Sequence, residues 1–217
     1  MVQPWAGVAS RLSTGLAGLD AQLGGGVPAG SVHVVLGEPM NAQELLSYHF
    51  ATAGSLRGGC QFLSTDYTKE EVLAGIKMVG GKPDRIEVHE LPNAKSKWAF
   101  PESGKGQIVV YDSYSQAIVQ GGWKEAMANL TKAKARARKS GDPLFVSVTG
   151  NLHSETERSA LRQWADGVFE LGFDRQGFGL YPYMKITKMR GVPDSARFLL
   201  FKETERGLFM ESTKRVF

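Results

Sequence analysis

Cysteine and long apolar runs are both scarce in this 217-residue sequence, and each scarcity excludes a class of protein. The single cysteine, Cys60, can form neither an internal disulfide nor a thiolate metal site, so we interpret it as a small buried hydrophobic residue. No stretch approaches the roughly 18 apolar residues of a membrane span. The first residues, MVQPWAGVAS, lack the basic and apolar regions of a secretion signal. We therefore expect a cytoplasmic protein without membrane contact.

The sequence also has few clusters of metal-ligand residues or of like charges. The four histidines show no ligand spacing, so we expect no metal site. Net charge is only +4, and the one dense basic run is KAKARARK, residues 132–139. A solvated helix face is the favoured interpretation of this run, because no aromatic residues are interleaved with it. The alternative is a nucleic-acid contact through Lys132, Lys134, Arg136 and Arg138.

Strand and helix patterns alternate through the first 170 residues. Apolar segments typical of buried strands cover residues 31–36, 60–65, 86–91, 107–111 and 143–149. Helical patterns cover residues 42–51, 66–78, 123–139 and 155–164, and Thr68 with Glu71 fits a capping box in the second of them. Because alternating strands and helices form βαβ units, we predict an α/β fold with a mainly parallel sheet, covered by helices on both faces.

The last third of the chain changes character. Short strand-like segments cover residues 167–171, 184–188, 197–201 and 208–210, and turn residues such as Gly172, Gly177 and Gly207 separate them. Residues 92–106 are polar and read as a surface loop. We predict a single domain over residues 1–217. Its parallel core spans about 11–171, and antiparallel C-terminal edge strands from hairpins span about 172–217.

Residues 37–45, GEPMNAQEL, stand between the first predicted strand and the first long helix. A strand, a tight turn and a helix N-terminus form the usual frame of a phosphate site, because free backbone N–H groups and the helix dipole converge there. A phosphate loop also needs glycines, a lysine for the β/γ-phosphates and a hydroxyl for magnesium. Here Ala42, Gln43 and Glu44 occupy those last three positions.

Five segments together resemble the KaiC-like branch of the RecA superfamily. They are RLSTGLAGLD (11–20), LGGGVPAGS (23–31), QIVVYDS (107–113), ADGVFEL (165–171) and KMRG (188–191). The resemblance covers nearly the whole chain, and the five segments occur in the family's order. It implies a RecA-like core, of a kind that often assembles into rings or filaments with nucleotide held between neighbours.

The resemblance also assigns roles position by position. In active relatives the loop runs Gly-x-Pro-Gly-Thr-Gly-Lys-Thr, and this chain keeps only two of those residues. The loop positions are Gly37, Glu38, Pro39, Met40, Asn41, Ala42, Gln43 and Glu44. The acidic pair that polarises water in relatives falls on Asp66 and Tyr67, and Asp112 matches the Walker B aspartate. Lys188 and Arg190 match residues that reach a neighbouring subunit's phosphates.

These replacements act against binding of Mg-ATP. Gln43 removes a positive charge that would attract the phosphates, and Glu44 adds a carboxylate that would repel them. Two like charges about 4 Å apart repel by about 4 kcal/mol at an effective dielectric near 20. Met40 and Ala42 add Cβ atoms where glycines let the backbone wrap phosphates. We therefore expect no cofactor and no catalytic residue. Asp66 and Asp112 remain as relics of a catalytic site, and Glu44 supplies negative charge to the helix terminus.

Three functions stay open from the sequence. The favoured one is a non-catalytic pseudo-ATPase that works as a scaffold or regulatory subunit, in a homo-oligomer or in a hetero-oligomer with an active relative. Lys188 and Arg190 are its interface candidates, although a surface ion pair would also explain them. The second is an ATPase with an atypical loop that binds ATP and Mg and is completed by Lys188 and Arg190 of a neighbour. The third is a nucleic-acid-binding RecA-like protein.

Overall fold

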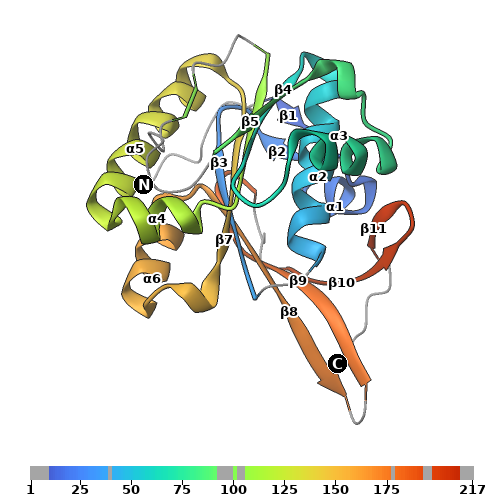
Figure 1. The fold of residues 1–217 in the computed structure, drawn as a ribbon. Helices are drawn as coiled ribbons and strands as arrows, with labels where there is room; N and C mark the ends of the chain where they lie inside the picture. Colours follow the sequence, from blue (N-terminus) through green and yellow to red (C-terminus); the bar gives the residue numbers. More distant parts are fainter. Residues whose placement is uncertain are drawn as a thin grey trace, which may run out of the picture.

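A computed structural model describes residues 10–38, 41–91, 100–101, 106–176, 179–192 and 197–210. These residues form a nine-stranded sheet in the order β11-β10-β9-β8-β3-β7-β6-β4-β5 (Figure 1). The strands are β3 (Val32–Gly37), β4 (Cys60–Ser64), β5 (Ile86–Glu90), β6 (Ile108–Asp112), β7 (Leu144–Thr149), β8 (Gly167–Gln176), β9 (Gly179–Met189), β10 (Arg197–Thr204) and β11 (Gly207–Met210). Strands β3 to β8 pair in parallel, whereas β9, β10 and β11 pair antiparallel.

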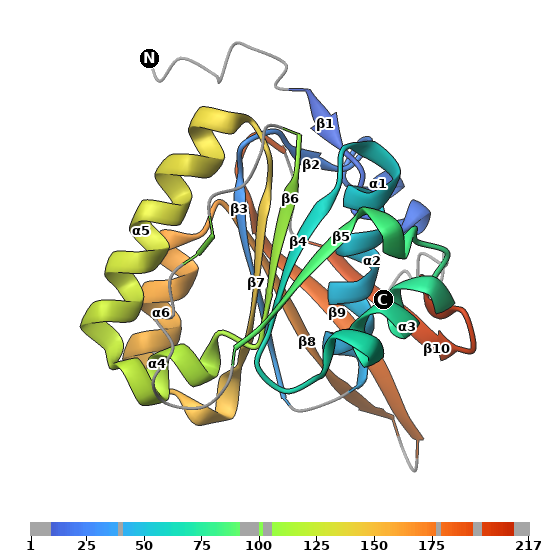
Figure 2. The ribbon, with the colours of Figure 1, turned by 45° about the horizontal axis from the view of Figure 1, so that its top comes forward.

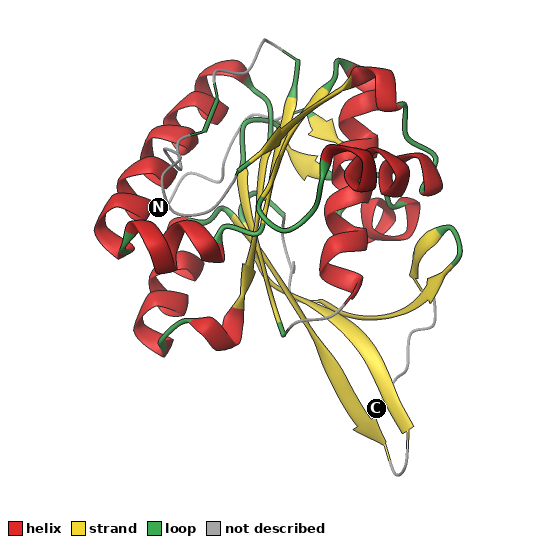
Figure 3. Ribbon diagram, viewed as in Figure 1, coloured by secondary structure: helices red, strands yellow, loops and turns green. Residues whose placement is uncertain are grey.

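Helices cover both faces of this sheet (Figures 1 and 3). On one face lie α1 (Ala17–Gln22), α2 (Asn41–Arg57) and α3 (Lys69–Met78), and on the other lie α4 (Ser115–Gly121), α5 (Trp123–Ser140) and α6 (Glu155–Trp164). Short elements complete the described chain: β1 (Arg11–Leu12), β2 (Val27–Pro28), and the 3-10 turns η1 (Pro83–Arg85) and η2 (Gly150–Leu152). The predicted fold class is confirmed, including the antiparallel C-terminal edge.

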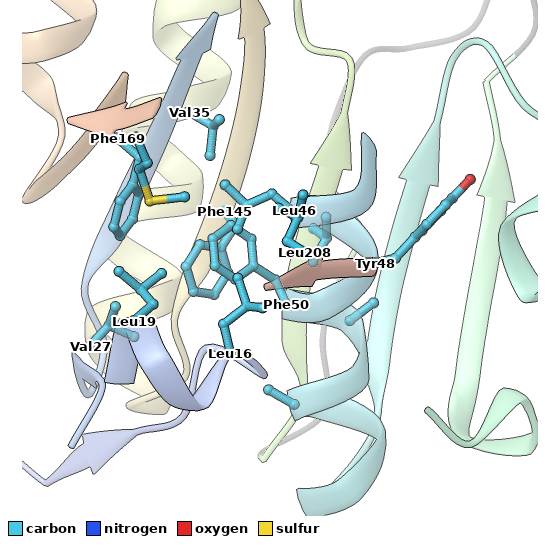
Figure 4. Packing of buried hydrophobic residues seen from close by; sticks show 14 of the residues in the cluster. Leu16, Leu19, Val27, Val35, Leu46, Tyr48, Phe50, Phe145, Phe169 and Leu208 are labelled. Carbon is cyan, nitrogen blue, oxygen red and sulfur yellow. The ribbon is translucent and has the colours of Figure 1, made fainter. Parts of the chain in front are cut away.

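An apolar layer on each face holds the helices to the sheet. On the α2 face, Phe50 stacks on Phe145 of β7, with ring centroids 3.7 Å apart and an interplanar angle of 13° (Figure 4). On the other face, Leu130 of α5 and Leu161 of α6 are fully buried in the layer that contains Val146 of β7. Full burial of one such side chain contributes about 1.5–3 kcal/mol. These layers fix α2 over the middle of the sheet.

The observed elements differ from the predicted ones in several places. The capping box of Thr68 and Glu71 is confirmed, and it begins α3 at Lys69 rather than at residue 66. Helix α4 was not predicted, because seven residues ending in glycine give too little periodicity to recognise. Helix α2 is longer than predicted and runs to Arg57. Of the predicted surface loop, residues 92–99 and 102–105 lie outside the described part of the chain.

Strands β8 and β9 are twice as long as predicted. Strand β8 pairs with β3 only as far as Leu171 and then continues with β9 alone. The two strands therefore leave the body as a ribbon, which runs out beyond both helical layers (Figures 1 and 2). Gly172, which was predicted to form a turn, lies inside β8 with the Tyr183 ring over it, whereas Gly177 lies outside the described residues. This ribbon projects from the edge of the sheet where the parallel strands end.

Candidate functional site

The carboxyl ends of the parallel strands meet at one edge of the sheet. Gly37 ends β3, Ser64 ends β4 and Asp112 ends β6, and helix α2 begins with Asn41 just after β3. Ser64 and Asp112 are register partners across β4 and β6. In open α/β sheets this edge is where ligands bind. The candidate site therefore lies between the first turn of α2 and the ends of β4 and β6.

The loop residues that the structure describes fill space rather than expose backbone. Pro39, Met40 and the Asn41 side chain lie outside the described residues. Ala42 is fully buried in the apolar layer of the α2 face. The Gln43 side chain is 6% exposed, and its Oε1 would lie 3.5 Å from a Cβ built on Gly37. Its amide Nε2 has no hydrogen-bond partner among the described residues. A neutral amide thus lies folded against the end of β3.

Glu44 is held by two tyrosines. The Tyr48 hydroxyl donates to Glu44 Oε1 at 2.5 Å, and the Tyr67 hydroxyl donates to Oε2 at 2.8 Å. Burial raises the pKa of both phenols, and their hydrogen bonds to Glu44 raise it further. Tyr48 lies one helical turn after Glu44, whereas Tyr67 comes from the loop after β4. Both carboxylate oxygens are therefore occupied by donors from the chain itself.

Asp112 is buried behind this cluster. The Ser147 hydroxyl of β7 donates a hydrogen bond to Asp112 Oδ1. The pKa of Asp112 is raised to about 6, mainly by burial and also by the charges of Glu44 and Asp66, against the lowering effect of hydrogen bonds from Ser147 and Ser47. The two predicted catalytic relics, Asp66 and Asp112, lie close enough for the charge of Asp66 to act on Asp112.

The electrostatic environment of the site is acidic. The negative charges of Glu44, Asp112 and Asp66 all act on Tyr67 and raise the pKa of its phenol. The same is true of the groups that act on Asp112 through charge. An acidic edge disfavours a polyphosphate, because like charges raise each other's free energy.

A buried serine–histidine pair next to the site was missed by sequence reasoning. His153 Nε2 lies 2.9 Å from Ser115 Oγ, which also accepts the backbone N–H of Thr149 at 2.8 Å. Ser115 is 1% exposed and His153 is 7% exposed, and burial lowers the pKa of the imidazole. With no exposed hydroxyl to attack a substrate, the pair instead ties α4 to the end of β7. Its only sequence signal was a lone histidine after a strand.

A group of cations gathers at the opposite edge of the sheet, where β3 and β8 begin. Asp166 is buried there and bonds to the Val32 backbone N–H through Oδ2. Around its Oδ1 lie Arg190 at 3.0 Å, Lys134 at 3.3 Å and Arg138 at 3.7 Å. We call these four residues the Asp166 cluster. It carries three positive charges around one negative charge.

Lys188 lies beside the Asp166 cluster. A β-bulge between Val168 and Phe169 shifts the register, so that Lys188 pairs with Val168. Its ammonium donates to the backbone carbonyls of Arg162 and Gln163, each at 3.0 Å, at the C-terminal end of α6. Positive charge is favourable at that end of a helix. The two predicted interface cations, Lys188 and Arg190, thus lie at one edge, and both also make contacts within the chain.

The basic run on α5 is divided in the structure. Lys134 and Arg138 belong to the Asp166 cluster, and Lys134 also donates to the Trp164 carbonyl. Arg136 donates to the Phe100 carbonyl at 2.9 Å and to the Pro101 carbonyl at 3.0 Å. Lys132 is exposed. Three of the four predicted nucleic-acid contacts therefore also hold the fold together.

The residues that the structure describes contain no group of three or more histidine, cysteine, aspartate or glutamate side chains that could hold a metal ion. Among their helices, none combines the length and the apolar character needed to cross a bilayer.

Comparisons with known proteins support the fold. Residues 11–202 match a family of unknown function (DUF7125). No match is found among the curated proteins. Among solved structures, the chain is similar to the KaiC-like protein PH0186 from the hyperthermophilic archaeon Pyrococcus horikoshii OT3, with a TM-score of 0.73 and 16% identity. That likeness covers 94% of this chain and 99% of the other. It shows a RecA-like fold.

Proposed function

This chain belongs to the family of unknown function DUF7125, and we propose that it is a non-catalytic RecA-like protein that acts through association. It would bind a second copy of itself or a related RecA-fold subunit, and it would hold no nucleotide. The observation that carries the proposal is the Glu44 carboxylate, which two tyrosine hydroxyls fix at the carboxyl edge of the sheet.

The loop after β3 lacks the groups that hold phosphate. A phosphate site needs a cation and free donors, and here the corresponding positions carry the neutral, buried Gln43 and the anionic Glu44. Mg-ATP would have to displace two hydrogen-bonded phenols and approach an acidic edge. Losing one attraction and gaining one repulsion of several kcal/mol lowers affinity by orders of magnitude, since each 1.4 kcal/mol is tenfold.

The two edges of the sheet carry charges of opposite sign. Glu44, Asp66 and Asp112 lie at the carboxyl edge, and the Asp166 cluster with Lys188 lies at the amino edge. Opposite charges on opposite ends of one molecule favour head-to-tail contact between copies. The glutamate would then supply in the interface the negative charge that nucleotide phosphates supply elsewhere.

Multi-angle light scattering with and without Mg-ATP tests this proposal. We expect an oligomer whose mass is indifferent to nucleotide and falls as salt rises, because surface charges are screened. Asp66→Lys, at an exposed position of the acidic edge, should dissociate it. Glu205→Lys, at an exposed position of the β10–β11 turn, is the matched control and should not. A monomer that assembles only when Mg-ATP is added would overturn the proposal.

A further inference from the structure

Residues 201–210 form a hairpin that leaves the main sheet at its antiparallel edge. Strand β10 pairs with β9 from Arg197 to Leu200, whereas its second half, from Phe201 to Thr204, pairs with β11. Among the described residues, this second half has no strand partner other than β11. Figure 1 shows the hairpin curving back towards α1 and α2. We call residues 201–210 the end hairpin.

Apolar side chains and one histidine hold the end hairpin against α2. Phe201, Leu208 and Met210 are buried in the apolar layer of the α2 face (Figure 4). The backbone N–H of Leu208 donates a hydrogen bond to Nε2 of His49 at 3.0 Å. His49 lies on α2 and is 5% exposed. A backbone donor of the last described strand is thus satisfied by a helix side chain 159 residues earlier in the chain.

The His49 ring packs closely against the turn of the end hairpin. A Cβ built on Gly207 would lie 2.5 Å from His49 Nε2 and 2.6 Å from Val79 Cγ1, at a φ of +93°. This position therefore requires glycine, both for its conformation and for the space beside the ring. Because Nε2 accepts the Leu208 N–H, we assign the proton of the neutral ring to Nδ1. The contact needs the neutral imidazole.

Protonation of His49 would turn this hydrogen bond into a repulsive contact. An imidazolium carries a proton on both nitrogens, so Nε2–H would face the N–H of Leu208, donor against donor. The ring would also carry a charge in a buried place, which costs free energy. Burial lowers the pKa of His49 to about 4 from its ordinary value of 6.5, and the Gly15 backbone near the ring opposes this lowering.

The charged groups on the elements around His49 do not account for its lowered pKa. They are Asp20 on α1, Lys77 in the last turn of α3, and Lys202, Glu203, Glu205 and Arg206 on the end hairpin. All but Asp20 are exposed, and the Asp20 carboxylate accepts hydrogen bonds from Ser13 and Thr14. None of these charges is among the causes that shift the pKa of His49. The response of His49 to pH therefore comes from its burial.

We propose that His49 is a pH-dependent anchor, which releases the end hairpin from α2 when the imidazole takes up a proton. Release uncovers Leu208 and Met210 together with the part of the apolar layer that they cover. Because the proton binds the open form more tightly than the closed form, acid shifts the population towards the open form. This device does not rest on the proposed function, since it requires neither an oligomer nor an empty nucleotide site.

The size of the effect follows from the affinity of His49 for the proton in the two forms. In the closed form the pKa is about 4, and in the open form the ring meets water and its pKa returns to the ordinary value of 6.5. Between pH 7.5 and pH 5 the ratio of open to closed molecules should therefore rise about 30-fold.

Native-state hydrogen exchange followed by NMR tests the release. The protection factor of the Leu208 amide, which is corrected for the effect of pH on intrinsic exchange, should fall about 30-fold between pH 7.5 and pH 5. Leu208 should also be less protected than Val146 in the middle of the sheet and less sensitive to low urea, because local opening exposes less surface than global unfolding. Exchange of Leu208 and Val146 as one unit at both pH values would overturn the proposal.

Two glutamine variants separate His49 from the general effect of acid. His49→Gln should keep the hydrogen bond, since the amide oxygen can accept the Leu208 N–H, and should abolish the 30-fold fall because an amide does not titrate. His153→Gln is the matched control, because His153 is also buried and bonds through Nε2, but to Ser115 on the other face of the sheet. It should leave the fall unchanged.

Each outcome for these variants decides the question. A fall that persists in His49→Gln, or that also vanishes in His153→Gln, would contradict the proposal. If His49→Gln does not fold, the comparison of Leu208 with Val146 in the unchanged protein decides by itself, since only a local release makes Leu208 exchange separately from the middle of the sheet.

Discussion

The hydrogen bond from Tyr48 to Glu44 gives the sharpest prediction about the site. Tyr48 is 3% exposed, and its hydroxyl lies 2.5 Å from a carboxylate oxygen. A hydrogen bond to a charged group contributes about 1.5–3 kcal/mol. Tyr48→Phe keeps the ring and removes only this bond, so it should lower the free energy of unfolding by about that amount. For a chain of this length the melting temperature should fall by about 3–12 °C.

Two matched variants separate this bond from a general effect of losing a phenol. Tyr67→Phe removes the other donor, but Tyr67 is 37% exposed and water can replace its hydroxyl. Its cost should therefore stay below about 1 kcal/mol. Tyr111 is fully buried, and its hydroxyl has no partner among the described residues. Tyr111→Phe should be neutral or stabilising, since it removes a buried polar group without a bond.

Urea unfolding at neutral pH, followed by circular dichroism, measures all three variants. Tyr48→Phe should be the most destabilising of the three, Tyr67→Phe should be intermediate, and Tyr111→Phe should be the least destabilising. If Tyr48→Phe costs less than about 0.5 kcal/mol, or if Tyr111→Phe costs as much, then Glu44 is not anchored by a buried phenol. The structural basis of the filled site would then be lost.

One change of pH and three substitutions test the surrounding structure. Burial lowers the pKa of His33 to about 3 and that of His49 to about 4. Above the unfolded pKa near 6.5 these histidines cost no stability, but the free energy of unfolding falls as pH drops toward 4, because the unfolded state then binds protons that the folded state excludes. At pH 5 each of the two histidines should lower the free energy of unfolding by about 2 kcal/mol relative to pH 7.5. Protonation of Asp112, whose pKa is raised, should offset about 1 kcal/mol of this loss. Urea unfolding should therefore show a net loss of about 3 kcal/mol. A constant stability across that range would contradict the burial of both imidazoles. Asp112→Asn should raise stability by about 1–3 kcal/mol at pH 7.5, where a buried carboxylate is charged, and this gain should vanish below pH 4, which a paired titration would detect. Gly15→Ala should cost more than about 3 kcal/mol, because a Cβ would lie 2.0 Å from the His49 carbonyl oxygen at a φ of +83°. Gly24→Ala, with a φ of +68° and open space, should cost only about 1 kcal/mol in the same thermal melts.

The sequence was sufficient where a local rule decides the structure. Thr68 and Glu71 form a capping box because both partners lie within one turn, and alternating apolar segments fix the parallel strands. The position of Asp112 at a strand end also followed from a local pattern. Such features need no knowledge of distant parts of the chain.

The contacts of Glu44 could not be predicted in the same way. Its i, i+4 relation to Tyr48 is visible in the sequence, but a glutamate and a tyrosine at that spacing on a helix rarely indicate a buried bond. The Tyr67 contact joins α2 to the loop after β4, and it exists only once the sheet has brought the two together. The sequence indicated loss of a phosphate site without indicating what fills it.

The antiparallel end of the sheet shows a different limit. Gly172 was predicted to separate two strands, yet the Tyr183 ring lies over it and β8 continues to Gln176. The bulge between Val168 and Phe169 also changes which face Lys188 occupies, and no residue in the sequence marks it. Which residues of β9 and β10 share a face therefore follows only from the register of the strands.

Isothermal titration calorimetry with Mg-ATP tests the central claim most directly. The account predicts no binding heat for the unchanged protein at concentrations where a working site would saturate. A variant whose residues 40–44 are replaced by Gly-Thr-Gly-Lys-Thr provides the positive control, since it restores the cation and the hydroxyl. Micromolar binding by the unchanged protein that disappears in Glu44→Ala would contradict the account.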